Sequence, residues 1–317
     1  MRAAAVTGAA GFIGTVLIRH LLSEGVQVVG IDRRPPAVPP PAAASMIVAD
    51  LLDGDADARS ALASADYVFH LAGRPGVRDQ HPDVVELRHR DNVEATRMVV
   101  ETIRPGTRLV VTSSSSVYGG CRAGSTSRED TPVAPRGGYA ESKLAVERLL
   151  ADYTRAGGNV LVARLFTAVG EGQRPDMALS RWISATLTGT PIEVFGSLER
   201  SRDFTDVREV AWALTALGRL KERAVVNVGS GQPHTLRQCI EAIEAVTGRT
   251  ALVHTTEAAF EEMAHTCADT TFIRDLLGRA PLTDLMDAVR RTYEARRAEG
   301  TDPTPPAGVA YRTIATS

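Results

Sequence analysis

The sequence predicts an α/β fold: a doubly wound parallel sheet with helices on both faces, followed by a smaller C-terminal α/β lobe. In residues 1–170, short apolar runs alternate with longer helical patterns, and this alternation is typical of a parallel sheet. A glycine-rich turn, TGAAGFIG, separates the first apolar run from the first helical stretch. After residue 170 the predicted elements become shorter, which indicates a second lobe.

The elements of the first half follow from these patterns in chain order. Apolar runs rich in valine and isoleucine are typical of buried strands, and longer stretches with a helical spacing of apolar residues indicate helices. A proline-rich loop occupies residues 33–41. The predicted strands are 3–6, 27–31, 45–48, 67–70, 108–112 and 160–165, and the predicted helices are 12–23, 84–103 and 139–156.

The second half contains short helices and brief strands. Helical patterns cover residues 179–188 and 236–246, and apolar runs cover 192–195 and 225–228. We expect a first domain over residues 1–170, to which residues 204–222 cross back. The second lobe would comprise residues 171–203 and 223–300, and the segment 301–317, rich in proline and threonine, would be a loose tail.

Composition excludes several classes of protein. The chain has 317 residues, 44% of them hydrophobic and 23% charged, which is typical of a globular protein. A formal net charge of −2 gives no field of one sign that would attract nucleic acid or an anionic membrane. Cys121, Cys239 and Cys267 lie far apart in the sequence, which argues against a disulfide framework or a zinc site. With no leader pattern and no long apolar stretch, we expect a cytoplasmic protein.

The glycine-rich turn is a candidate phosphate-binding site. It places glycines at 8, 11 and 14 between the first strand and the first helix, where backbone N–H groups and the positive end of the helix dipole meet an anion. Asp32 ends the second strand, and a carboxylate there can accept hydrogen bonds from ribose hydroxyls and repel a 2′-phosphate. This pattern favours NAD over NADP, although Arg33 could stack on adenine or meet a phosphate.

A tyrosine and a lysine form a candidate catalytic pair. Tyr139 and Lys143 are four residues apart in YAESK, so a helix would place both side chains on one face. A phenol has a pKa near ~10, and a neighbouring ammonium together with a nicotinamide ring would draw that pKa toward neutral. Tyr139 could then take a proton from an alcohol as a hydride leaves for NAD. Four hydroxyls in SSSSVYG, residues 113–119, end the strand before this helix.

In these motifs, in this order and spacing, the chain resembles the extended short-chain dehydrogenase/reductase family of nucleotide-sugar epimerases and dehydratases. The resemblance extends from residue 3 to about residue 295 and rests on TGAAGFIG, Asp32, Asp50-Leu51, HLAG (70–73), SSSSVYG and YAESK. It implies a Rossmann-type domain that binds NAD and a C-terminal lobe that binds a UDP- or dTDP-sugar. It also implies a homodimer through a four-helix bundle built from the helices 84–103 and 139–156.

The resemblance also assigns residues to roles. Tyr139 would be the base, Lys143 its electrostatic and ribose-binding partner, and Ser114 a hydroxyl at the reacting oxygen. Asn92 matches a family asparagine near the cofactor. The residues expected to bind NAD are Gly8, Gly11, Phe12, Ile13, Gly14, Asp32, Arg33, Asp50, Leu51, Leu71, Ala72, Gly73, Asn92, Tyr139 and Lys143.

The strand-end motif indicates which reaction follows oxidation at C4 of the sugar. Similar dehydratases carry TDEVYG and similar decarboxylases TSEVYG, whereas the corresponding positions here are Ser115 and Ser116. A serine hydroxyl is neither a useful acid nor a useful base near neutral pH, so abstraction of the C5 proton has no obvious agent. What remains is rotation of the 4-keto sugar and return of the hydride, which is 4-epimerisation.

A second motif indicates the substrate. GQRPDM, residues 172–177, resembles a loop of UDP-glucuronate 4-epimerases, and the serine hydroxyls could hold a uronate carboxylate out of alignment for loss of CO₂. The family's RDF motif places Arg202 on the UDP pyrophosphate. The expected substrate-binding residues are Arg78, Ser114, Ser115, Ser116, Thr167, Arg174 and Arg202.

Some positions depart from the family pattern. Thr167 stands where many relatives have asparagine, and Gly138 where proline is common. Relatives have an arginine before the Ala-Asp pair at 268–269, where this chain reads Met-Ala-His at 263–265. The alternatives left open are an epimerase for UDP-glucose or UDP-N-acetylglucosamine, a UDP-glucuronate decarboxylase, and a non-catalytic NAD-binding redox sensor.

Overall fold

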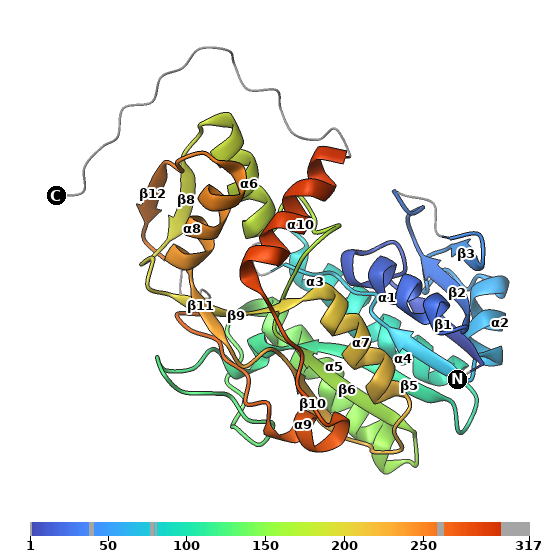
Figure 1. Cartoon of the computed structure of the whole chain (residues 1–317). Coiled ribbons are helices and arrows are strands. Elements are labelled where there is room, and N and C mark those ends of the chain that lie inside the picture. The colour runs from blue at the N-terminus through green and yellow to red at the C-terminus, as the bar shows by residue number, and fades with distance from the viewer. Residues whose placement is uncertain (1, 38–40, 77–78, 80, 259–262, 299–317) are drawn as a thin grey trace.

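The computed structural model describes residues 2–37, 41–76, 79, 81–258 and 263–298. Figure 1 shows a large sheet flanked by helices and a smaller lobe, which contains α6, α8 and α10, beside it. Arg78 and the predicted tail at 301–317 lie outside the described residues.

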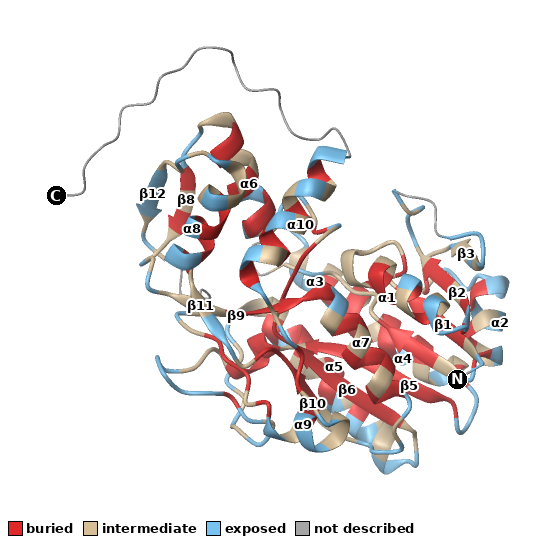
Figure 2. Ribbon diagram, viewed as in Figure 1, coloured by how far each residue is buried: buried red, intermediate tan, exposed pale blue. Residues whose placement is uncertain are grey.

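The large sheet has seven strands in the order β10-β6-β5-β4-β1-β2-β3, and every neighbouring pair is parallel. Its strands are mostly buried because helices cover both faces, as their continuous apolar sequences predict (Figure 2). This arrangement confirms the predicted fold class. The strands are β1 (Ala3–Thr7), β2 (Gln27–Asp32), β3 (Ala44–Val48), β4 (Tyr67–His70), β5 (Arg108–Ser114), β6 (Val160–Leu165) and β10 (Val225–Val228).

Two hydrophobic clusters attach the helices to the sheet. One face carries α1 (Phe12–Ser23), α7 (Val207–Gly218) and α9 (Thr271–Leu277). The other face carries α2 (Ala56–Ser64), α4 (Ala95–Thr102) and α5 (Gly137–Arg155).

The helix expected at 84–103 is not regular throughout. It consists of α3 (Val84–Arg88), a π-helical segment η1 (His89–Glu94) and α4. A π-helical turn adds one residue per hydrogen-bonded ring, and such turns are frequent at functional sites. This segment carries Arg90, Asp91 and Asn92 toward the strand ends described below.

The strand at 225–228 corrects the predicted domain boundary. We assigned it to the second lobe, but β10 pairs in parallel with β6 and forms an edge of the large sheet. The apolar run correctly indicates a strand, whereas its sheet partner is set by the path of the chain through α7, which packs against α1.

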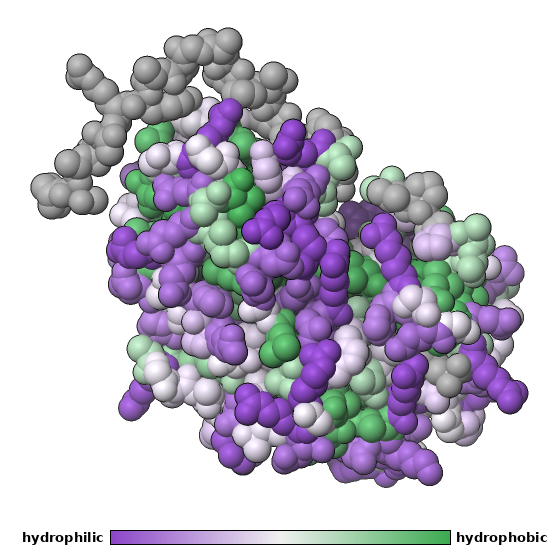
Figure 3. Space-filling view, viewed as in Figure 1, coloured by the Kyte–Doolittle hydropathy of each residue, from purple (hydrophilic) through white to green (hydrophobic). Residues whose placement is uncertain are grey.

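The smaller lobe has its own hydrophobic core, to which α6 (Ala178–Thr188), α8 (Leu236–Thr247) and α10 (Leu285–Ala298) contribute. A two-stranded parallel sheet joins β8 (Ile192–Phe195) to β12 (Val253–Thr256). A three-stranded sheet contains β7 (Thr167–Val169), β9 (Ser201–Asp206) and β11 (Pro233–Thr235). The face seen in Figure 3 is mostly hydrophilic, with apolar side chains in small separate groups. Among the described residues, no helix has the length and apolarity needed to cross a lipid bilayer.

Candidate active site

The candidate site lies where the carboxyl ends of parallel strands meet. β1 leads into the glycine-rich turn, β4 into residues 71–76, and β5 into a 3₁₀ turn, η2 (Ser115–Tyr118). Since β1, β4 and β5 are neighbours in the sheet, these three segments converge at one edge. Ligands of open α/β sheets bind at this edge.

Glycines bring the first two of these segments into backbone contact. Gly8 has φ +70°, and a Cβ there would lie 2.7 Å from the backbone nitrogen of Ala72. A Cβ at Gly14 would lie only 2.2 Å from the carbonyl oxygen of Gly8. No side chain can therefore be accommodated at either position without a shift of backbone.

The start of α1 fits a phosphate. Its N-cap is Gly11, and no side chain caps the helix, which begins with Phe12 and Ile13. The Thr15 hydroxyl donates to the Gly11 carbonyl at 2.9 Å, which fixes this turn without using the first N–H groups of the helix. These N–H groups and the helix dipole fit the pyrophosphate of a dinucleotide.

Asp32 connects the end of β2 to the glycine-rich turn. Its carboxylate accepts hydrogen bonds from the backbone N–H groups of Ala10, at 3.1 Å, and Arg34, at 3.0 Å. Each carboxylate oxygen has a further lone pair, so the group can still accept ribose hydroxyls as the sequence predicts.

Arg33 and Asp50 belong to an ion-pair cluster with the π-helical segment. Arg33 pairs with Asp91 at 2.9 Å, and Arg90 bridges Asp91 at 2.8 Å and Asp50 at 3.0 Å. Burial opposes ionisation of Asp50, but its hydrogen bonds and Arg90 hold the pKa of this carboxyl below its ordinary value. In this structure Arg33 is thus engaged with a carboxylate.

The small residues after β4 allow close packing at the cofactor edge. A Cβ at Gly73 would lie 2.6 Å from the side-chain oxygen of Asn92. Leu51 and Ala72 join the core on one face of the sheet, and Leu71 packs against the core on the other.

Asn92 holds two parts of the site together. It is buried, its side-chain oxygen accepts from the backbone N–H of Arg74 at 2.7 Å, and its amide donates to the Ser142 hydroxyl at 2.8 Å. It therefore fixes the loop after β4 against α5, the helix that carries Tyr139 and Lys143.

The structure brings Tyr139, Lys143 and the end of β5 together. Ser114 lies close enough to Tyr139 for its hydroxyl to lower the pKa of the phenol by hydrogen bonding, and the Lys143 ammonium donates to the Thr112 carbonyl at 3.0 Å. Burial lowers the pKa of Lys143 to about 8, while the negative charge of Glu147 acts in the opposite direction. The predicted spacing of the pair on one helical face is thus observed in α5.

The electrostatics of Tyr139 differ from the expectation. Burial raises the pKa of the phenol, and the groups that act against this rise are Ser114, Arg174 and Arg88. The lowering that we expected from Lys143 is not among these effects. The ammonium is instead directed at the β5 backbone.

The four serines have different environments. Ser113 donates to Glu147 at 2.6 Å and so belongs to the core. Ser114 accepts from the backbone N–H of Ser116 at 3.2 Å while it contacts Tyr139. Ser115 and Ser116 are buried, and the Ser116 hydroxyl has no hydrogen-bond partner among the described residues. An unpaired buried hydroxyl at a strand end fits a polar ligand group.

The strand β7 begins at Thr167, and the loop that follows this strand carries Arg174. Arg174 forms a two-pronged pair with Asp176, at 2.9 and 3.0 Å, and its charge acts on the Tyr139 phenol. The loop that contains GQRPDM therefore lies close enough to Tyr139 for the charge of Arg174 to act on its phenol.

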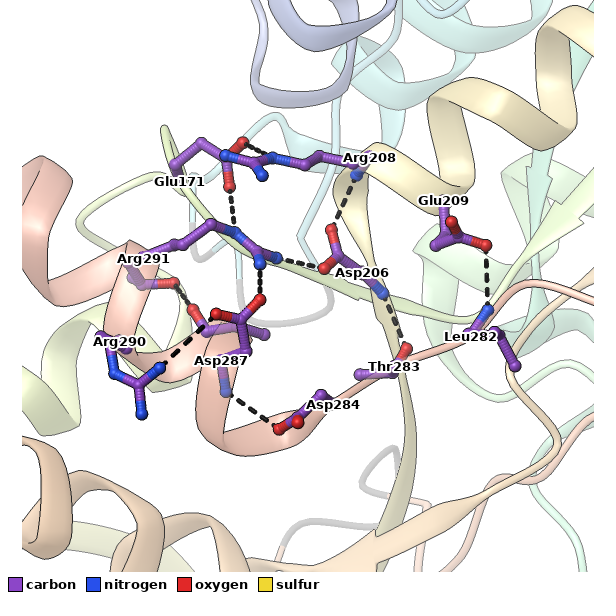
Figure 4. Close-up of polar contacts among 12 residues, drawn as sticks. Glu171, Asp206, Arg208, Glu209, Leu282, Thr283, Asp284, Asp287, Arg290 and Arg291 are labelled. Carbon is purple, nitrogen blue, oxygen red and sulfur yellow. Dashed lines mark hydrogen bonds and ion pairs between the residues drawn. The ribbon is translucent and has the colours of Figure 1, made fainter.

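An ion-pair network anchors the start of this loop (Figure 4). Arg291 of α10 contacts Glu171 at 3.1 Å and also pairs with Asp206 and Asp287. Glu171 contacts Arg208 of α7 as well, at 2.5 Å. The network thus joins the substrate loop to both α7 and the C-terminal helix.

Arg202 lies in β9 beside the segment that lacks the family arginine. Its guanidinium donates to the carbonyls of Ser201, at 2.9 Å, and Ala264, at 3.2 Å. His265 hydrogen-bonds to the Ser201 hydroxyl at 2.9 Å. The segment around His265 therefore packs directly against the strand that presents Arg202.

Sequence reasoning missed Arg88. This arginine ends α3, is 5% exposed, and donates to the Gly76 carbonyl at 2.6 Å. It belongs to no motif that we identified, so only its charge near Tyr139 in the structure reveals it. In the part of the chain that the structure describes, no group of three His, Cys, Asp or Glu side chains is arranged to hold a metal ion.

Comparisons with known proteins agree with this site. Residues 4–229 match the profile described as "NAD dependent epimerase/dehydratase family". The chain is 34% identical over 304 residues to "Uncharacterized UDP-glucose epimerase YtcB" of Bacillus subtilis, covering 90% of this chain and 94% of the relative.

Solved structures also match over nearly the whole chain. MoeE5, solved with UDP-glucuronic acid and NAD, is 36% identical with a TM-score of 0.84, covering 94% of this chain and 99% of that one. MoeE5 has also been solved with UDP-glucose and NAD. UDP-glucuronic acid 4-epimerase of Bacillus cereus is 28% identical with a TM-score of 0.85, and the shares covered are again 94% and 99%. The motifs, the fold and these matches together show that the chain belongs to the NAD-dependent epimerase/dehydratase family.

Proposed function

We propose that this enzyme is an NAD-dependent UDP-hexose 4-epimerase that interconverts UDP-glucuronate and UDP-galacturonate. The observation that carries the proposal is the pairing of Tyr139 with Ser114 at a strand end whose next residues, Ser115 and Ser116, have no carboxyl group. The glycine cradle and the uncapped start of α1 fit NAD. The likeness to MoeE5 and to the Bacillus cereus 4-epimerase supports the choice of substrate.

In this mechanism the residues of the chain move one proton and hold the sugar. Bound NAD supplies reversible hydride acceptance at C4 of the sugar. Ser114 bridges the C4 oxygen and the Tyr139 hydroxyl, and Tyr139 removes the C4 hydroxyl proton and later returns it. Lys143, held by the Thr112 carbonyl, would supply a hydrogen-bond donor to the ribose of bound NAD.

Retention of the uronate carboxylate follows from the same strand end. After oxidation at C4 the sugar is a β-keto acid, and it loses CO₂ only if the carboxylate aligns with the carbonyl π system. Ser115 and Ser116 offer hydroxyl groups that hold the carboxylate in another orientation. Since neither residue is an acid or base, proton removal from C5 is not supported.

Arg174 and Arg202 complete the substrate contacts in this proposal. Arg174, beside Tyr139, meets the sugar, and Arg202 meets the UDP pyrophosphate. We also keep Thr167, at the start of β7, as a substrate contact predicted from the sequence. We keep Arg78 as a further anion contact predicted from the sequence.

A variant at Ser116 tests the substrate directly. The Ser116 hydroxyl has no partner to lose among the described residues, so Ser116→Ala should leave stability unchanged. A lost hydrogen bond to a carboxylate should raise KM for UDP-glucuronate by about tenfold. KM for UDP-glucose, which lacks the carboxylate, should change much less. Equal effects on both substrates would argue against carboxylate binding at this position.

UDP-glucose is the second candidate substrate, because MoeE5 has been solved with either sugar nucleotide. NMR of the products from both substrates, without added NAD, discriminates the two. Inversion at C4 of UDP-glucuronate supports the proposal, and turnover of UDP-glucose alone would replace it.

We also propose a homodimer in the cytoplasm, in which α3, η1, α4 and α5 form the four-helix bundle. Val85 of α3 is 66% exposed, an apolar side chain that such a bundle would cover. Light scattering with Val85→Asp tests the dimer: the variant should become monomeric, and an unchanged dimer would place the interface elsewhere.

A further inference from the structure

Arg88 is a buried cation at the edge of the active site. Its side chain lies between the loop after β4, where it donates to the Gly76 carbonyl at 2.6 Å, and the first turn of α5. Only 5% of the residue is exposed. Burying a charge is costly unless it is compensated, so this placement requires a physical reason.

The first turn of α5 makes room for this guanidinium. A Cβ at Gly138 would lie 3.1 Å from the Nη1 atom of Arg88, closer than an ordinary van der Waals contact. A glycine there, in place of the proline that is common in relatives, therefore lets Arg88 reach the residue adjacent to Tyr139. Gly138 thus leaves space that a Cβ would take from the tip of this side chain.

Among the described residues, no carboxylate lies within ion-pair distance of Arg88. Asp79, whose pKa the charge of Arg88 helps to lower, is itself paired with Arg74 at 2.6 Å. The Nε atom of Arg88 is buried without a hydrogen-bond partner among the described residues. Within that part of the chain, the positive field of Arg88 is therefore available to the phenol beside it.

We propose that Arg88 is a positioning residue of the active site that keeps a permanent positive charge beside Tyr139 and favours its phenolate, and that Gly138 is the residue that admits it. The role rests on the proposed function, in which Tyr139 is the base. An arginine suits the role because it stays protonated throughout the pH range of the reaction.

Other groups also face Tyr139, from each element packed around it. The Ser114 hydroxyl acts on the phenol from the end of β5, and the charge of Arg174 acts on it from the loop after β7. Lys143 lies one turn along α5. Arg174 acts on the phenol as well, but its charge is shared with Asp176, and its side chain is more exposed to solvent. Salt therefore screens Arg174 more than Arg88.

The test measures ionisation of Tyr139 without relying on turnover. Absorbance at the phenolate band, taken as the difference between each enzyme and its Tyr139→Phe derivative, reports the pKa of this tyrosine alone. Arg88→Gln should raise that pKa by about 0.5–1 unit, because a cation near an ionisable acid favours its charged form. Arg88→Lys should shift it less, and Arg59→Gln, on the exposed surface of α2, should leave it unchanged.

Kinetics provide the second readout. The rising limb of kcat/KM against pH should move to higher pH in Arg88→Gln by the same amount, with KM for the UDP-sugar nearly unchanged. Gly138→Ala, which keeps Arg88 but crowds its guanidinium, should give a smaller shift in the same direction. An unmoved phenolate titration in folded Arg88→Gln overturns the inference.

The two proposals fail in different ways. If Tyr139→Phe retains turnover, the assignment of the base is wrong, whatever Arg88 does. If Tyr139→Phe abolishes turnover but Arg88→Gln and Gly138→Ala leave the Tyr139 titration unmoved, only the role of Arg88 is wrong. Should Arg88→Gln not fold, Gly138→Ala and Arg88→Lys still decide the question.

Discussion

The ion pair between Arg164 of β6 and Glu147 of α5 lies directly beneath the catalytic strand end. The two side chains are 6% and 7% exposed, and two hydrogen bonds, at 2.7 and 3.0 Å, join them. Ser113 adds a third contact to the carboxylate at 2.6 Å. We predict that Arg164→Met, which keeps the length of the side chain but removes its charge, destabilises the fold strongly.

The magnitude follows from what the substitution leaves behind. Glu147 would remain buried without its paired guanidinium, and breaking one side of a buried pair costs about 3–5 kcal/mol. For a chain of this length that loss corresponds to a fall of about 5–10 °C in the thermal midpoint. Arg164→Met/Glu147→Leu removes both charges of this pair and leaves Lys143 as the buried cation nearby, and well-packed apolar replacements of such pairs are often near neutral.

Thermal denaturation followed by circular dichroism measures the three variants side by side. The single variant Arg164→Met should lose most stability, and Arg164→Met/Glu147→Leu should recover most of that loss. The reasoning would be refuted if the single variant were as stable as the parent, or if the double variant were less stable than the single one.

Three further predictions address the cofactor turn, the lysine and the substrate loop. Gly14→Ala should abolish NAD binding, measured by calorimetry, because its Cβ would lie 2.2 Å from a backbone oxygen of the same turn; retained affinity would contradict the cradle. In the parent, the free energy of unfolding should increase from about pH 8 to the ordinary lysine pKa of 10.5, because the unfolded chain binds the Lys143 proton more tightly than the folded chain does. Lys143→Met should remove this increase, and an unchanged pH profile of the free energy of unfolding would contradict the prediction. Arg291→Met should raise KM for the UDP-sugar several-fold by removing one of the two arginines that hold Glu171, whereas the matched control Arg290→Met, at the more exposed neighbouring arginine, should not; equal effects would show that the network does not act on the loop.

Much of the fold could be predicted from the sequence because its periodic patterns are strong. The glycine turn, the buried strand 160–165 and the helix carrying Tyr139 are local features, and local spacing determines them. The sheet position of β10 could not be predicted, since an apolar run of four residues pairs equally well in either lobe. The π-helical turn at 89–94 was also missed, because its shifted hydrogen bonds leave no mark in the apolar spacing.

The residues of the candidate site could be predicted where they belong to a sequence motif, and they could not be predicted elsewhere. The contact of Ser114 with Tyr139 follows from the strand-end motif and the helix after it. Arg88 was missed because its proximity to Tyr139 arises only when α3 packs against α5. The effect expected from Lys143 together with a bound nicotinamide ring stays a prediction. The spacing of YAESK places both residues on one face but does not show that the ammonium donates to the Thr112 carbonyl.

The central claim is oxidation and return of hydride at C4 without proton exchange at C5. Incubation of UDP-glucuronate with the purified enzyme in D₂O, without added NAD, tests it by NMR of the product. The account predicts UDP-galacturonate that carries no deuterium at C4 or C5. Deuterium at C5, a UDP-pentose, or an unchanged C4 configuration would contradict it.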